Sequence, residues 1–204
     1  MTKMARQLQL YDLISSIPDI DDPSNGIIVG PAEIMRSFRM SLRMLQRDLK
    51  DLRDCGLINA KYVKKKNRYF KVKDKEMPED IPARRMQHLL RLYRIGTLIN
   101  DLSRTPSSLI ENYESAMISF NEFIEMAEED PENFTAEDIE IEREFLPDPP
   151  PVYDLKTEYY TLFPDSNERT RQRDFKELRD AGFELYYSKE YGAYIFVEDD
   201  VYDY

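Results

Sequence analysis

The chain of 204 residues carries a formal net charge of −11, with 34% charged and 41% hydrophobic residues. This length leaves room for one large or two small domains, and the apolar content is sufficient for packed cores. Because Cys55 is the only cysteine, disulfide frameworks and cysteine-based zinc sites are excluded.

Several features argue against membranes and against catalysis. No apolar run approaches the length of a membrane span, and residues 1–10 lack the apolar segment of a signal peptide, so we expect a cytoplasmic protein. His88 is the only histidine, and no Ser/His/Asp, Cys/His or glycine-rich phosphate motif is present. We therefore predict that the protein is not an enzyme and holds no cofactor or metal.

The charge is distributed unevenly along the chain. Residues 1–75 contain 16 Lys and Arg against 9 Asp and Glu, a net charge of +7. Residues 76–151 have a net charge of −12, and residues 152–204 have −6. Exposed charges act over a Debye length, about 8 Å at physiological salt, so the acidic remainder does not exclude nucleic-acid binding by the basic part.

The basic part begins with two short helical patterns. Hydrophobic spacing predicts a helix over residues 3–17, followed by a polar loop at 19–26. The β-branched residues 27–29 predict a small strand that pairs with a later hairpin. Residues 31–38 predict a second helix with a proline in its first turn.

A third, strongly amphipathic helix is predicted over residues 40–57. Ser41 is a suitable N-cap, and Gly56 stands where a left-handed residue commonly ends a helix. One predicted stripe of this helix is formed by Leu42, Leu45, Leu49 and Leu52. The opposite, mostly basic face carries Arg43, Gln46, Arg47, Lys50 and Arg53.

A predicted hairpin follows this helix. Two β-rich runs, residues 57–63 and 69–72, flank a basic turn-forming loop at 64–68. A basic amphipathic helix by itself is commonly a solvated surface helix. Two helices joined by a very short turn and followed by a basic hairpin form the winged-helix arrangement, which favours DNA binding.

The third helix also resembles a known signature. The segment SLRMLQRDL from Ser41 to Leu49, with Leu52 and Gly56 downstream, resembles the S-x-R-T-I-x-R-D-I…L…G signature of DeoR/YafY-type winged-helix transcriptional regulators. Met44 stands where that family usually has threonine, and the resemblance covers about the first 75 residues. These regulators are often attached to a WYL ligand-sensing domain, which has no counterpart here, so the effector stays open.

The predicted winged helix is expected to contact duplex DNA through two sets of residues. Residues near the start of the third helix are expected to reach base edges: Ser41, Arg43, Met44, Gln46 and Arg47. Residues expected to contact phosphates or the minor groove are Lys50, Lys64, Lys65, Lys66 and Arg68. Asp48 is expected to be structural and to hold a neighbouring arginine in place. Because one reading helix gives little specificity, a homodimer on a palindromic site is expected.

The C-terminal part repeats this pattern after a linker at residues 76–82. A helix is predicted over residues 83–102, followed by an acidic insert at about 105–150 with helices over 108–129 and 135–145. Residues 173–183 then align without gaps on residues 47–57, at an offset of 126. Residues 155–163 would be the preceding helix, and 184–197 the second wing.

The predicted fold class is therefore mainly α with small β-wings (α+β), in two winged-helix domains at 1–75 and 83–204. The segment Leu90–Ile95 in the predicted helix at 83–102 also resembles Leu8–Leu13, so that helix is expected to be the first helix of the second copy. A possible second DNA-binding set consists of Asn167, Arg169, Thr170, Gln172 and Arg173.

The second copy departs from the first at two places. Arg171 falls on the core position of Leu45, so it must snorkel, pair with an acid of the insert, or lie in a rotated helix. The second wing lacks the triple lysine, so retention and loss of DNA binding by this copy both stay open. An alternative function is a protein-interaction module whose acidic insert docks a basic partner or mimics DNA.

Overall fold

The computed structural model describes residues 1–73 and 78–198, which form a mainly helical chain with small sheets. The chain divides into two compact units. Unit 1 comprises Met1–Leu102 and Tyr159–Phe183, and unit 2 comprises Ser103–Glu158 and Glu184–Tyr204. The expected domain boundary near residue 75 lies outside the described residues, and the two winged-helix domains stay a prediction.

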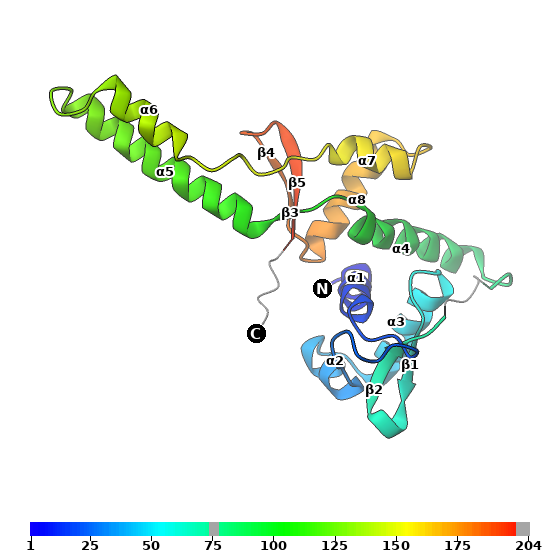
Figure 1. The fold of residues 1–204 in the computed structure, drawn as a ribbon. Helices are drawn as coiled ribbons and strands as arrows, with labels where there is room; N and C mark the ends of the chain where they lie inside the picture. The colour runs from blue at the N-terminus through cyan, green and yellow to red at the C-terminus, as the bar shows by residue number, and fades with distance from the viewer. Residues whose placement is uncertain (74–77, 199–204) are drawn as a thin grey trace. The chain divides into compact units, whose positions relative to one another are not determined.

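The N-terminal half of unit 1 contains the three predicted helices (Figure 1). They are α1 (Lys3–Ser15), α2 (Pro31–Ser37) and α3 (Leu42–Asp54). Thr2 caps α1 through its side chain, and Ser41 caps α3 as predicted. These side chains accept hydrogen bonds from backbone N–H groups that the first turn of a helix leaves without a partner.

The predicted hairpin is present as β1 (Ala60–Val63) and β2 (Arg68–Lys71). The strands are antiparallel, with Val63 opposite Arg68, and a short 3-10 turn at Lys64–Lys66 joins them. Asn67 closes the turn with a φ of 49°, in the left-handed region that asparagine adopts more readily than most residues.

The predicted strand over residues 27–29 is wrong. Of these residues, Val29 forms a backbone hydrogen bond to the hairpin: its carbonyl accepts from the Tyr69 N–H at 3.0 Å. The edge of β2 is instead occupied by the chain after α1, where the Pro18 carbonyl accepts from the Lys71 N–H at 2.9 Å and the Ile20 N–H donates to Lys71. With that edge already paired, residues 27 and 28 remain exposed.

The remaining helices of unit 1 pack against the first three. They are α4 (Ala83–Asp101), the last turn of α7 (Leu155–Leu162) and α8 (Glu168–Asp180). Phe175 and Leu178 are buried, and α8 packs on α4. The buried apolar side chains of this unit include Leu8, Leu10, Ile14, Leu45, Leu52, Leu92, Ile95, Phe175 and Leu178.

Gly96 permits a close approach between α4 and the end of α3. A Cβ built on Gly96 would lie 2.4 Å from Cδ1 of Leu57, far inside van der Waals contact. Leu57 follows directly after Gly56, whose φ of +83° turns the chain out of α3. The leucine that follows the helix therefore packs onto α4 only because residue 96 lacks a side chain.

Unit 2 combines a small sheet with a helical hairpin. Its strands are β3 (Thr105–Pro106), β4 (Leu185–Ser188) and β5 (Ala193–Glu198), in the order β3-β5-β4. β4 and β5 are antiparallel, as the predicted second hairpin requires, and β3 pairs with β5 in parallel. Thr105 and Pro106, which lie between the predicted helices at 83–102 and 108–129, thus form a short strand.

The acidic insert forms α5 (Ser107–Glu129) and α6 (Ala136–Glu144), which pack side by side (Figure 1). A small core of Ile110, Ile195 and Val197 joins the base of α5 to the sheet. Thr135 caps α6 in a capping box with Asp138, whose carboxylate accepts from the Thr135 N–H at 2.8 Å.

Candidate nucleic-acid interface

The exposed face of α3 carries the predicted base-reading side chains. Ser41 Oγ accepts from the Met44 N–H at 3.3 Å and so fixes the start of the helix. In the part of the chain that the structure describes, no carboxylate forms an ion pair with the exposed residues Arg43, Arg47 or Lys50. The side chains that share this exposed face are Ser41, Arg43, Met44, Gln46, Arg47 and Lys50.

The predicted leucine stripe is only partly correct. Leu45 and Leu52 are fully buried, but Leu49 is half-buried and Leu42 is 46% exposed. Leu42 is the first residue of α3. The buried face of α3 instead includes the acids Asp48 and Asp51, which a pattern of apolar spacing assigns to the solvent.

Asp48 orients α3 through an ion pair across the core. Its side chain is 1% exposed, and Arg6 of α1 donates from Nε to Asp48 Oδ2 at 2.7 Å. Gln7 also donates from Nε2 to Asp48 Oδ1 at 3.1 Å. Asp48 therefore holds an arginine, as predicted, but this arginine is Arg6 of α1 and not a neighbour in the sequence.

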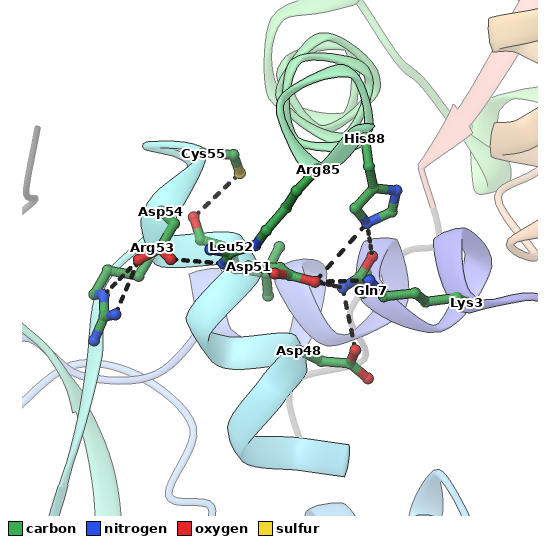
Figure 2. Close-up of polar contacts among 10 residues, drawn as sticks. All are labelled: Lys3, Gln7, Asp48, Asp51, Leu52, Arg53, Asp54, Cys55, Arg85 and His88. Carbon is green, nitrogen blue, oxygen red and sulfur yellow. Dashed lines mark hydrogen bonds and ion pairs between the residues drawn. The ribbon is translucent and has the colours of Figure 1, made fainter. Parts of the chain in front are cut away.

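Asp51 connects α3 to both α1 and α4 (Figure 2). Its carboxylate accepts from Lys3 Nζ at 2.8 Å, from Gln7 Nε2 at 3.0 Å and from Arg85 Nη2 at 3.0 Å. Burial alone would raise the pKa of Asp51, but the hydrogen bonds from Lys3 and Arg85 outweigh it and lower that pKa. Arg85 also donates to Asp54 at 2.7 Å, so one α4 arginine binds two α3 carboxylates.

These contacts place two further cations beside the exposed face of α3. A groove of about 600 Å³ is lined by Lys3, Arg43, Gln46, Arg47, Lys50, Asp51 and Arg85. Asp51 is the single acid in this lining, and it is already paired with Lys3 and Arg85. The sequence did not reveal Lys3 and Arg85 as groove residues, because their position depends on how α1 and α4 pack.

The hydrogen bonds of Gln7 determine the tautomer of His88. Since the Gln7 amide nitrogen donates to two carboxylates, its Oε1 is the atom that faces His88 Nε2, at 2.9 Å. Nε2 must therefore carry the proton. Burial is the main cause that lowers the pKa of His88, and Lys3 and Arg91 lower it further, against the opposing effect of Asp51 and Asp48.

We expect His88 to make stability depend on pH. Because its pKa is lower when folded than the ordinary value of 6.5, the unfolded chain takes up a proton first as the pH falls, and stability decreases below about pH 6.5. His88→Gln retains a donor toward Gln7 but cannot titrate. Chemical denaturation between pH 8 and 5 is expected to show a flatter profile for this variant; the same slope in both proteins would contradict the assignment.

The β1–β2 hairpin, which we call the wing, presents the predicted basic loop. Lys64, Lys65 and Lys66 are exposed, and Arg68 is half-buried. Lys66 Nζ and the Arg68 guanidinium lie 4.9 Å and 4.7 Å from the centre of the buried Phe70 ring, in cation–π contacts. Phe70 therefore orients two of the four cations, while Lys64 and Lys65 extend into solvent.

The possible second reading helix, α8, begins in the same way as α3. Asn167 Oδ1 accepts from the Thr170 N–H at 2.9 Å, and Arg169 and Arg173 are exposed. Thr170 is half-buried. Gln172 is exposed but donates from Nε2 to Glu168 Oε1 at 2.9 Å, so its amide already has a partner.

Arg171 is accommodated in a way that the sequence did not predict. Its side chain is only 3% exposed, so it does not snorkel, and its Nη2 donates to Glu168 Oε1 at 2.5 Å within the same helix. The guanidinium also lies 5.1 Å from the centre of the Phe175 ring. Arg171 is the main cause that lowers the pKa of Glu168 to about 2, so this carboxylate stays charged beside it.

Comparison of the chain with protein-family models, with curated proteins and with solved structures yields no match in any of the three. Among the described helices, none is both long enough and apolar enough to cross a membrane. Within residues 1–73 and 78–198, no group of three or more His, Cys, Asp or Glu side chains could hold a metal ion.

Proposed function

We propose that the protein is a transcriptional regulator that binds duplex DNA, with α3 as its reading helix and the β1–β2 wing on the backbone. The observation that carries the proposal is the cationic face of α3: Arg43, Arg47 and Lys50 form no ion pair within the described residues, and they border a groove whose single acid is already paired. A helical pair followed by a third helix and a basic hairpin is the element order of a winged helix.

The side chains on this face match the chemistry of the major groove. An arginine can donate two hydrogen bonds to O6 and N7 of guanine, and Gln46 can pair with N6 and N7 of adenine. Arg43, Gln46 and Arg47 fall within two turns at the start of α3, where a reading helix contacts bases. The resemblance of residues 41–56 to DeoR/YafY-type regulators supports the same assignment.

The cations around this face suit contact with phosphates. Lys50 and the groove residues Lys3 and Arg85 flank the reading side chains, and the basic loop of the wing adds Lys64, Lys65, Lys66 and Arg68. Phosphate contacts hold a protein in register on the duplex and supply affinity that is independent of sequence. We propose that Lys50 and the wing perform this positioning.

Replacing Lys64, Lys65 and Lys66 together by glutamine should weaken binding about equally on all duplex sequences. Each lost phosphate contact lowers the slope of log K against log salt by about one, because fewer counterions are released. The slope is measured by titrating a labelled duplex at several salt concentrations. The triple arginine variant, which keeps the charge, serves as the control. A glutamine variant with the wild-type slope would rule out contact between the wing and the backbone.

A second candidate function is supported by the α5–α6 hairpin. Residues 107–144 contain 13 acidic residues and only one basic residue, Arg143. Apolar side chains are nevertheless exposed on or beside these helices: Leu109, Ile118, Met126, Ile141 and Phe145. Such a surface suits a basic partner protein with apolar side chains, or could imitate the charge of DNA. DNA affinity unaffected by changes in α3 would favour this function.

A further inference from the structure

α3 and α8 have equivalent beginnings and ends at the predicted offset of 126. Ser41 and Asn167 each accept from the N–H three residues later. Gly56 and Gly182 follow the two helices with φ values of +83° and +95°. The Leu57 N–H donates to Leu52 at 3.2 Å, and the equivalent Phe183 N–H donates to Leu178 at 3.1 Å. The repeat therefore extends from the sequence to the hydrogen bonds at both helix ends.

The ion pairs that hold these helices are also repeated. Arg6 donates from Nε to Oδ2 of Asp48 at 2.7 Å, and Arg94 donates from Nε to Oδ2 of Asp174 at 2.6 Å. One turn further, Lys3 pairs with Asp51 at 2.8 Å and Arg91 with Glu177 at 2.6 Å. Each carboxylate pair differs by 126 positions, whereas each cation pair differs by 88.

The first helix of the repeat is therefore α4 at an offset of 88, which differs from the spacing of 82 between the similar segments Leu8–Leu13 and Leu90–Ile95. Burial follows the same register, because Leu10 and Tyr11 correspond to Leu98 and Ile99, and all four are buried. The similarity in sequence instead matches residue types at positions of α4 that are exposed, such as Leu90. The offset of 88 aligns the cations of α1 and α4 that bind α3 and α8.

The helices of unit 1 pack as two equivalent pairs. α1 packs on α3 and α4 packs on α8, while α1 and α4 pack on each other. Each first helix also contacts the other copy's third helix: Gln9 donates to the Ala181 carbonyl at 2.6 Å, and Arg85 binds Asp54 at 2.7 Å. The residues in these two cross-contacts are not equivalent by the offsets of 88 and 126, but the pattern of helix–helix contacts is unchanged when α1 is exchanged with α4 and α3 with α8, as a two-fold axis between α1 and α4 requires.

The exposed arginines of α3 recur on α8. Arg43 corresponds to Arg169 and Arg47 to Arg173, and all four side chains are exposed. In the described part of the chain, neither Arg169 nor Arg173 forms an ion pair with a carboxylate. Within unit 1 of a single chain, α3 and α8 thus carry arginines at the same two positions of their exposed faces.

We propose that one chain is an internal pseudo-dimer that binds a two-part duplex site as a monomer, reading one part with α3 and the other with α8. This inference rests on the proposed function. It replaces the expected homodimer, because the second reading helix is supplied by the same chain. The two parts of the site should differ in sequence, since Met44 is replaced by Thr170 and the Gln172 amide is bound to Glu168.

The test uses the full chain and a duplex selected with it from random sequences. We expect sedimentation of the complex to give one chain per duplex, and chemical footprinting to show two protected regions. Arg169→Ala with Arg173→Ala should weaken binding by about 5- to 150-fold per lost base contact and remove one region only. Arg43→Ala with Arg47→Ala should remove the other. Arg169→Lys with Arg173→Lys should keep the salt slope but lose sequence discrimination.

Two outcomes separate this inference from the proposed function. Two chains per duplex, or wild-type affinity and footprint for the Arg169 and Arg173 variant, would overturn the pseudo-dimer while α3 remains a reading helix. Wild-type binding by the Arg43 and Arg47 variant would instead overturn the proposed function. Circular dichroism and thermal unfolding of each variant establish that the exposed substitutions leave the fold intact.

Discussion

Replacing Arg43 and Arg47 together by alanine is expected to weaken binding to a selected duplex by about 2–6 kcal/mol, since one bidentate base contact contributes about 1–3 kcal/mol. Both side chains are exposed on α3 and have no ion pair in the described residues, so their loss should not affect folding. Fluorescence anisotropy with a labelled duplex measures the change.

The matched control for this pair is Arg43→Lys with Arg47→Lys. Lysine keeps the charge but cannot form the planar two-point contact with guanine, so the control should retain affinity for unrelated duplexes and lose preference for the selected one. If the alanine variant binds the selected duplex as tightly as the wild type, α3 is not the reading helix.

Asp174→Ala is expected to lower the free energy of unfolding by about 3 kcal/mol, toward the lower end of the range for breaking a buried ion pair. Asp174 is 0% exposed and accepts from Arg94 at 2.6 Å and from the Tyr159 hydroxyl at 2.9 Å. The substitution leaves both donors without this acceptor. Because Arg94 is a quarter exposed, water can partly replace the lost carboxylate, and we do not expect a loss at the upper end of that range.

The control for Asp174 lies on the same helix. Asp180 accepts from Lys176, but both side chains are largely exposed, so Asp180→Ala should have little effect on stability. Denaturation in urea compares the two variants with the wild type. If both variants lose the same small amount of unfolding free energy, Asp174 does not hold α8 against α4.

Local features of α3 were predictable from sequence. Ser41 and Gly56 mark the ends of α3 through hydrogen bonds and a backbone angle that involve only neighbouring residues. The repeated N-cap at Asn167 follows from the same local chemistry. The exposure of Arg43 and Arg47 followed from helical periodicity, because both lie opposite the buried Leu45 and Leu52.

Features that depend on tertiary packing were not predictable in this way. Asp48 and Asp51 look like surface acids in a helical pattern, and they are buried only because α1 and α4 bring cations to them. Lys3 and Arg85 enter the groove for the same reason. The wrong strand at residues 27–29 arose because β-branched residues suggest pairing, while the available edge of β2 was occupied by the chain near Pro18.

The most direct test of DNA reading by this protein is a binding selection of the full chain on random duplex DNA. The proposed function predicts that repeated rounds enrich a defined sequence containing guanines at the positions that Arg43 and Arg47 contact, and that the Arg43 and Arg47 alanine variant fails to enrich it. A pool that remains random with the wild-type chain, or the same sequence enriched by the variant, would contradict sequence-specific reading through α3.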